Sequence, residues 1–231
     1  MGKEVIAVFD IGKTNKKLLL FDMELNLINE SGERFPVTID EEGFECDDIE
    51  LIEKWVMSSL QKLVKSGEIN LRAVNFATYG ASLVYIDGQG KRLTPVYNYL
   101  KPVDESIPAR LYERYGGKDE FCRCTASPAL GMLNSGIQTL WLKHTRPEIF
   151  SRVKHILHLP QYFSFMLTGK ALSEHTSIGC HTALWDFDRM DYHEWTKDEG
   201  LKLPSPVPVN TLNEARILNR KVLCGTGLHD S

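Results

Sequence analysis

The segment AVFDIGKTNKKLLLFD, residues 7–22, decides the fold. In it an apolar run ends at Asp10, a short turn carries Gly12, and a second apolar run follows Lys17. Two apolar runs joined by so short a turn predict an antiparallel pair of strands. A third strand-like run over residues 25–35 extends the pair to a three-stranded meander.

A helix and a further strand follow the meander. Apolar side chains recur at helical spacing over residues 47–66, where Asp47 and Glu50 predict a capping box at the helix start. Residues 71–80 then predict a buried strand parallel to its neighbour, and residues 81–96 predict a hairpin around DGQG. This order of elements predicts a ribonuclease-H-like α/β fold.

We expect a five-stranded mixed sheet with flanking helices, whose first three strands are antiparallel and whose edge is elaborated by residues 97–169. A helical region is predicted over residues 147–170, with Gly169 at its end. Within it, His155 and His158 lie three residues apart. They are either ligands on one helix face or structural histidines with satisfied hydrogen bonds.

Composition limits the classes of partner. The 231 residues carry a net charge of -4 and no run of Lys or Arg, which gives little support to a nucleic-acid footprint or a polybasic membrane anchor. The apolar run after MGKE is too short to span a membrane and lacks the features of a signal peptide. We therefore expect a cytoplasmic protein that acts on a small molecule. The five cysteines, an odd number without zinc-site spacing, predict free thiols.

The turn after Asp10 has the chemistry of a phosphate site. Gly12 permits close approach of backbone N–H groups to a ligand. Thr14 and Asn15 add side-chain donors, and Lys17 adds a positive charge. Asp10, at the end of a buried strand, is placed to hold Mg²⁺ directly or through water. A polar hairpin turn without a ligand is the other interpretation, and the motif alone leaves both open.

Several segments together resemble one known family. DIGKTNKK followed by LLLFD, residues 10–22, resembles the phosphate hairpin of the FGGY carbohydrate kinases, within the actin-like ATPase superfamily. ATYGASLVYIDGQGKRLTPVYNY, residues 77–99, resembles one wall of their sugar site, and its Tyr79-Gly80 pair looks most like the rhamnulokinase branch. Further segments that resemble family landmarks are LTGK (167–170), HTALWDF (181–187) and GTGLHDS (225–231). The resemblance thus runs along nearly the whole chain.

The resemblance implies a sugar-binding domain over residues 1–231, with residues 97–169 as loops and helices of the sugar site and a nucleotide-binding C-terminal domain outside this chain. It implies ATP-dependent phosphorylation of a ketose-like sugar with Mg²⁺, and it leaves a homodimer open. In these kinases a carboxylate in a Gly-His-Asp setting, here Asp230, accepts the proton of the sugar hydroxyl. The substrate-binding residues that it implies are Tyr79, Gly80, Tyr97 and Asn98.

A non-catalytic sugar-sensing or scaffold protein with an actin-like fold is the alternative function. The presence of both Asp10 and Asp230 favours the kinase, because a pure binding module needs no metal carboxylate together with a base.

Three places depart from the family pattern. Where the family often has Trp-x-Asp-x-Arg near the sugar, this chain has YNYL at residues 97–100, so the familiar carboxylate is missing. Gly80 and Ala81 stand where glycerol kinases carry an Arg-Glu clamp, which disfavours glycerol and favours a larger ketose. Lys13 stands where Thr or Ala is usual, and it either contacts a phosphate or points into solvent.

Six further polar residues fit a sugar site and a structural role about equally well. If the role is structural, helix packing explains His175, His181 and Tyr162. The start of a helix explains Asn134, Ser135 and Gln138.

Overall fold

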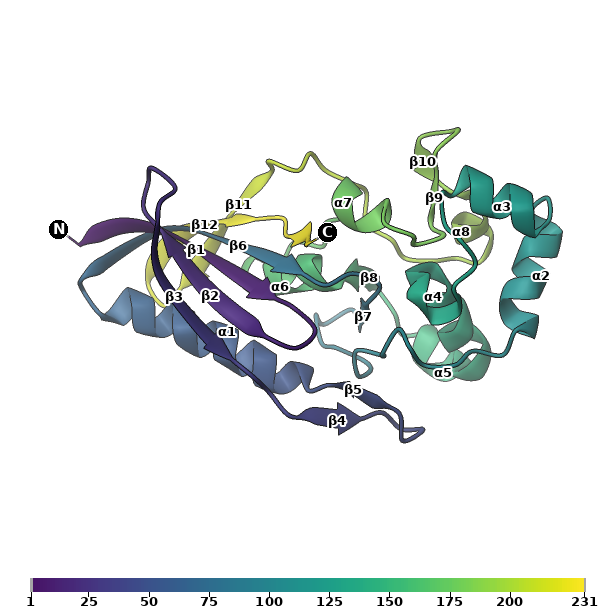
Figure 1. The fold of residues 1–231 in the computed structure, drawn as a ribbon, viewed down its shortest axis with the longest axis horizontal. Coiled ribbons are helices and arrows are strands. Elements are labelled where there is room, and N and C mark those ends of the chain that lie inside the picture. The colour runs from purple at the N-terminus through teal and green to yellow at the C-terminus, as the bar shows by residue number, and fades with distance from the viewer. Residues whose placement is uncertain (1, 231) are drawn as a thin grey trace.

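The computed structural model describes residues 2–230, and its centre is a seven-stranded mixed sheet (Figure 1). The strand order is β11-β12-β6-β1-β2-β3, and β13 also pairs with β6. Strands β1, β2 and β3 are antiparallel and β1 is parallel to β6, which confirms that part of the expectation. The strands are β1 (Lys3–Ile11), β2 (Lys16–Phe21), β3 (Leu27–Glu33), β6 (Ile69–Thr78), β11 (Leu212–Ile217), β12 (Arg220–Gly225) and β13 (Leu228–His229).

Two strands that the sequence did not reveal raise the sheet from the expected five strands to seven. β11 forms an antiparallel hairpin with β12, and its buried apolar side consists of Ala215 and Ile217 only, too short a pattern to stand out. β13 resumes the pairing with β6 that β12 begins. Between them the backbone N–H of Gly227 donates to the side-chain Oδ1 of Asn75 in β6 instead of to a backbone carbonyl.

The main core lies on one face of the sheet under two helices. Phe9 and Phe76 are partners in the register of β1 and β6, and their rings stack with centroids 5.5 Å apart. Trp55 of α1 (Ile49–Lys65) lies 5.2 Å from Phe9, and Phe163 of α6 (Leu159–Thr168) lies 5.6 Å from Phe76. Because side chains alternate along a strand, this register places Asp10 on the opposite face, where it is half-buried.

The start of α1 corrects the expected capping box. The N-cap is Asp48, whose Oδ1 accepts from the N–H of Leu51 at 3.1 Å. Asp47 is the last residue of β5 (Glu45–Asp47), which pairs with β4 (Val37–Ile39). Its side chain is therefore directed to other partners, described below.

The region expected to be helical over residues 147–170 is interrupted by a strand. It contains α5 (Pro147–Phe150), then β8 (His155–His158), then α6, which ends as expected at Gly169 in a left-handed conformation with φ 66°. β8 pairs with β7 (Leu83–Ile86), so a distant strand overrides the local helical pattern. The expected hairpin around DGQG forms a single bridge, from Ile86 to Arg92.

A lobe made mostly of helices is inserted between β6 and β11 and lies beside the sheet (Figure 1). It has two apolar cores of its own, one of which includes Trp185 and Trp195. Residues of 171–203 contribute to these cores, so the insertion extends beyond residues 97–169. Its remaining elements are α2 (Ser106–Arg114), α3 (Lys118–Cys124), η1 (Gly131–Leu133), α4 (Ser135–Thr145), α7 (His175–Ile178), β9 (Trp185–Asp186), β10 (Asp191–Tyr192) and α8 (Glu194–Asp198). Among residues 2–230, none of the helices has the length and apolar character needed to cross a membrane.

Candidate active site

Three parallel strands end at the same edge of the sheet. Ile11 of β1 and His229 of β13 are both register partners of Thr78, the last residue of β6. The chain continues this order beyond the strands, since the N–H of Tyr79 donates to the carbonyl of Ile11 at 3.1 Å and the N–H of Asp230 donates to that of Thr78 at 3.1 Å. Ligand sites of open α/β sheets lie outside such carboxyl ends.

A cavity of about 500 Å³ opens at this edge, between the sheet and the helical lobe. Its volume lies within the range usual for small-molecule sites. The lining residues are Lys13, Tyr79, Gly80, Ala81, Tyr99, Leu133, Cys180, His181, His229 and Asp230. The structure thus brings together Tyr79, Gly80 and Asp230, which the sequence nominated, with residues that it did not.

Gly80 is required by the approach of His229. A Cβ atom on Gly80 would lie 2.3 Å from Nε2 of His229, so no side chain fits there without displacing the imidazole. Nδ1 of His229 is buried and has no hydrogen-bond partner within residues 2–230, and Nε2 lies 3.7 Å from Oδ1 of Asp230. His229 is a candidate site residue that the sequence reasoning passed over, although it stands in the GTGLHDS segment.

Two residues of the cavity wall have strained backbones. Ala81 and His181 adopt positive φ angles of 55° and 52°, which non-glycine residues rarely do. The start of α4 holds both, because Gln138 Nε2 donates to the carbonyl of Ala81 and Asn134 Nδ2 donates to that of His181. Ser135 shares a hydrogen bond with His158 instead. Gln138 and Asn134 therefore fix the backbone of the cavity wall by hydrogen bonds to its carbonyl groups.

A buried ion cluster lies behind Tyr79. Oδ2 of Asp47 lies 2.5 Å from Nζ of Lys13 and 2.8 Å from the hydroxyl of Tyr79, and Oδ1 accepts from Lys16 Nζ at 3.1 Å. Burial opposes ionisation of Asp47, but the hydrogen bond from Lys13 and the two ammonium charges hold the pKa of this carboxyl below its usual value. Burial, together with the charge of Asp47, raises the pKa of Tyr79 well above its usual value, so this phenol stays a donor.

The turn between β1 and β2 lies beside this edge and has its own hollow. The N–H of Gly12 donates to the carbonyl of Asn15 at 3.0 Å, which closes the turn, and Thr14 is exposed. Oδ1 of Asn15 accepts from Arg34 Nε at 2.8 Å, and Lys17 pairs with Glu30 at 2.8 Å. A cavity of about 370 Å³ is lined by Asn15, Lys17, Gly32, Glu33 and Arg34. Asp10 is the register partner of Lys17 on the neighbouring strand.

The lining of the cavity includes neither Tyr97 nor Asn98. Tyr97 is fully buried, donates to Oε1 of Glu41 at 2.7 Å and packs edge-on against Trp141. Asn98 Nδ2 donates to the carbonyl of Glu45 at 3.0 Å. The residue of this segment that lines the cavity is Tyr99, whose ring centroid lies 6.4 Å from that of Tyr79.

Two of the other nominated residues have structural partners outside the cavity lining. The hydroxyl of Tyr162 donates to Oε1 of Glu53 at 2.5 Å. The ring of His175 packs against Trp185 with centroids 5.2 Å apart. Tyr162 thus links α6 to α1, and His175 packs α7 against β9.

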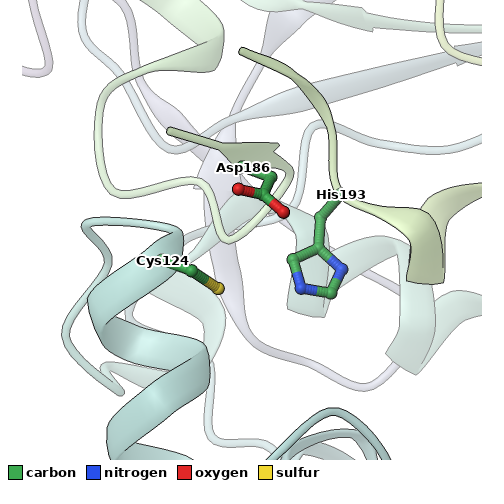
Figure 2. Close-up of side chains that lie close together, drawn as sticks. All are labelled: Cys124, Asp186 and His193. Atoms are coloured by element: carbon green, nitrogen blue, oxygen red, sulfur yellow. The ribbon is translucent and has the colours of Figure 1, made fainter. Parts of the chain in front are cut away.

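A second group of ligand-type side chains lies in the helical lobe (Figure 2). The ligand atoms of Cys124, Asp186 and His193 all lie within 4.8 Å of one another. However, His193 Nδ1 accepts from the N–H of Trp195, so the proton of the neutral ring is on Nε2, which then has no lone pair for a metal. Asp186 accepts from two backbone N–H groups and lies 3.7 Å from the Arg189 guanidinium. These contacts describe a structural network, and all five cysteines are free thiols as expected.

Comparison with known proteins places the sequence of this chain in a family. The sequence model for the N-terminal domain of the FGGY family of carbohydrate kinases matches residues 5–199. A rhamnulokinase of Halalkalibacterium halodurans is 26% identical over 204 residues, which are 84% of this chain and 41% of that protein. One of Klebsiella pneumoniae is 30% identical over 151 residues, 63% of this chain and 30% of that protein. The chain thus spans less than half the length of these relatives.

Solved structures share the fold. A carbohydrate kinase from Novosphingobium aromaticivorans aligns with a TM-score of 0.87 and 24% identity, over 100% of this chain and 50% of that one. A ligand-bound xylulose kinase from Lactobacillus acidophilus aligns with a TM-score of 0.83 and 19% identity, over 98% and 48% of the two chains. A Plasmodium falciparum glycerol kinase solved with ADP aligns with a TM-score of 0.82 and 15% identity, over 99% and 49%. The mixed sheet, the flanking helices and the match over residues 5–199 show that this chain belongs to the FGGY family of carbohydrate kinases and carries its N-terminal domain.

Proposed function

We propose that this chain is the sugar-binding part of a cytoplasmic, ATP-dependent kinase that phosphorylates a ketose-like sugar, and that a second domain outside residues 1–231 binds the nucleotide. The observation that supports this most strongly is the meeting of Tyr79, Gly80 and Asp230 in one cavity at the ends of three parallel strands. Such an edge suits phosphoryl transfer, which depends on positioning and on charge neutralisation.

Asp230 serves as the general base in this proposal. Among the described residues that line the cavity it is the one carboxylate. Its backbone is held by Thr78, and the imidazole of His229 lies beside it. A carboxylate anchored in this way can accept the proton of a sugar hydroxyl as that oxygen attacks phosphorus. General-base catalysis typically contributes about 10²- to 10⁴-fold to the rate.

The turn between β1 and β2 receives the phosphates. Gly12 allows close approach, and the exposed Thr14 hydroxyl and Asn15 amide add donors. The ion pair of Lys17 with Glu30 is exposed on both sides, so a phosphate can compete for the ammonium at little cost.

Asp10 is the residue that would hold Mg²⁺. It is half-buried at the end of β1, and one carboxylate together with substrate phosphate oxygens is a ligand set that Mg²⁺ commonly uses. When bound, the ion neutralises charge on the transferring phosphate.

The cavity favours a ketose larger than glycerol. Gly80 and Ala81 carry no side chains long enough to clamp a three-carbon substrate, and the rings of Tyr79 and Tyr99 offer apolar faces to the carbon chain of a sugar. Tyr97 and Asn98 fix the segment that carries Tyr99 and so act as positioning residues.

The test is sugar-dependent release of ADP by a protein that joins this chain to a nucleotide-binding half. Five- and six-carbon ketoses and glycerol are compared at equal concentrations. We expect turnover with a ketose and the lowest kcat/KM with glycerol. Glycerol as the best substrate would contradict the proposal, and sugar binding without formation of ADP from ATP with any of the sugars would favour the non-catalytic sensor.

A further inference from the structure

Lys13 contributes a cation to the cavity. It follows Gly12 in the turn after β1, and its side chain is 33% exposed and lines the cavity that contains Asp230. Nζ lies 5.1 Å from the ring centroid of Tyr79 and 5.6 Å from that of Tyr99. The ammonium therefore sits at the wall formed by the two aromatic rings. Lys13 is not part of the lining of the cavity of about 370 Å³ beside the turn between β1 and β2, and its ammonium does not simply point into solvent.

Lys13 shares its counter-ion with a second ammonium group. Asp47 is its ion-pair partner, but the same carboxylate also pairs with Lys16, whose side chain is 2% exposed. Two ammonium groups thus share one carboxylate, so the three side chains of Lys13, Lys16 and Asp47 together carry a charge of +1. Lys16 is enclosed and donates a second hydrogen bond to the carbonyl of Lys13, so of the two ammonium groups it is Lys13 that reaches the cavity. An ammonium has three donors, and one contact with Asp47 leaves donors for a ligand.

Lys13 and the proposed base, Asp230, follow strands on opposite sides of β6. Lys13 follows β1, and Asp230 follows β13, each a direct neighbour of β6. Adjacent strands are about 4.8 Å apart, so the two outer strands are separated by roughly 10 Å. A six-carbon chain, extended at each end by a protein side chain, can bridge that separation. One substrate of this length can therefore contact both Lys13 and Asp230.

The geometry points to Lys13 as the receptor for an acidic group on the sugar, so that the substrate is a keto-sugar acid whose carboxylate binds Lys13 and whose hydroxyl meets Asp230. This inference rests on the proposed function, because it takes the cavity as the sugar site. Asp47 then keeps Lys16 and Tyr79 as partners while Lys13 engages the ligand. The Tyr79 and Tyr99 rings flank the carboxylate and limit its hydration, which strengthens the contact.

The experiment measures binding by calorimetry to this chain without ATP, so it does not depend on phosphoryl transfer. The ligands are matched pairs that differ in one acidic group: D-fructuronate against D-fructose, and D-gluconate against D-glucitol. We expect fructuronate to bind about 10- to 100-fold more tightly than fructose, the range that a hydrogen bond between charged groups usually supplies. The preference should shrink in 0.5 M KCl, because Lys13 is partly exposed.

Three variants decide whether Lys13 is responsible. Lys13→Met should remove the preference for the acid over the matched neutral sugar, and Lys13→Arg should retain most of that preference. Lys54→Met on α1 removes one exposed charge away from the cavity and should change nothing. If Lys13→Met fails to fold, two measurements still test the inference. They are the salt dependence of the acid preference in the unaltered chain and the acid preference of Lys13→Arg.

Equal affinities within each pair, or no binding of either acid at 10 mM, would overturn the inference while the kinase proposal stands. A loss of the preference in Lys54→Met equal to that in Lys13→Met would also overturn it. Tight binding of the acid that depends on Lys13, without phosphate transfer in the two-domain protein, would support the inference and contradict the kinase.

Discussion

Replacement of Asp47 by Asn should destabilise the chain strongly, because it leaves a buried ammonium without its counter-ion. Lys16 is 2% exposed and Asp47 is 8% exposed, so water cannot replace the lost carboxylate around Lys16. Lys13 is 33% exposed and can rehydrate, and therefore adds less to the loss. Removing one partner of a buried pair typically costs about 3–5 kcal/mol. For a chain of this size each kcal/mol lowers Tm by about 2–4 °C, so we expect Tm to fall by about 6–20 °C.

Differential scanning calorimetry at pH 7 measures this effect, with Glu50→Gln as the control. Glu50 is also acidic and lies close in sequence, but its ion pair with Lys54 is exposed, so Tm should hardly change. Adding Lys16→Met to Asp47→Asn should recover more than half of the loss, because a buried ion pair can often be replaced by apolar side chains without loss. If Asp47→Asn melts within about 2 °C of the unaltered chain, or if the double variant melts no higher than the single one, the stranded-charge explanation is wrong.

Three further outcomes are expected. Burial, with a smaller contribution from the charge of His229, lowers the pKa of His158 from 6.5 to about 3, so stability is full above pH 6.5 and is lost as pH falls toward 3. Urea unfolding should show a loss of about 2 kcal/mol between pH 7.5 and pH 5 from this residue, and an equal loss in His158→Gln would argue against it. Gly80→Ala should cost about 1–3 kcal/mol by forcing His229 aside, whereas Gly88→Ala, whose Cβ meets nothing within 4 Å, should be neutral; equal melting temperatures of the two variants would refute the close packing. This chain alone should bind ATP with a Kd of about 1 mM or weaker, and a micromolar Kd by calorimetry would show that it holds the nucleotide unaided.

Local patterns in the sequence were enough to predict the centre of the fold. The hairpin around Gly12, the helix after Asp47 and the parallel strand ending at Thr78 each depend on neighbouring residues. β8 was missed because the pairing of His155–His158 with Leu83–Ile86 is set by packing between distant segments, and the local sequence there fits a helix.

The candidate site, like the fold, could be predicted only in part from the sequence. Tyr79, Gly80 and Asp230 could be nominated only because their segments resemble those of the FGGY kinases, and all three line the cavity at the strand ends. The role of Asp47 could not, since its partners come from two other segments of the chain. In the segment YNYL, sequence alone does not say which residues face inward, and Tyr99 rather than Tyr97 lines the cavity.

The most direct test of the central claim is steady-state kinetics of Asp230→Asn in the two-domain protein, with saturating MgATP and varied sugar. Asparagine keeps the shape of the side chain and can still hydrogen-bond the hydroxyl, but it cannot accept its proton. We expect kcat to fall by about 10²- to 10⁴-fold at a similar KM for the sugar. Asp10→Asn provides the contrast, because its defect should be partly relieved by raising the concentration of Mg²⁺. If Asp230→Asn retains more than about a tenth of the unaltered kcat, another residue accepts the proton and the account of this cavity as the catalytic site is contradicted.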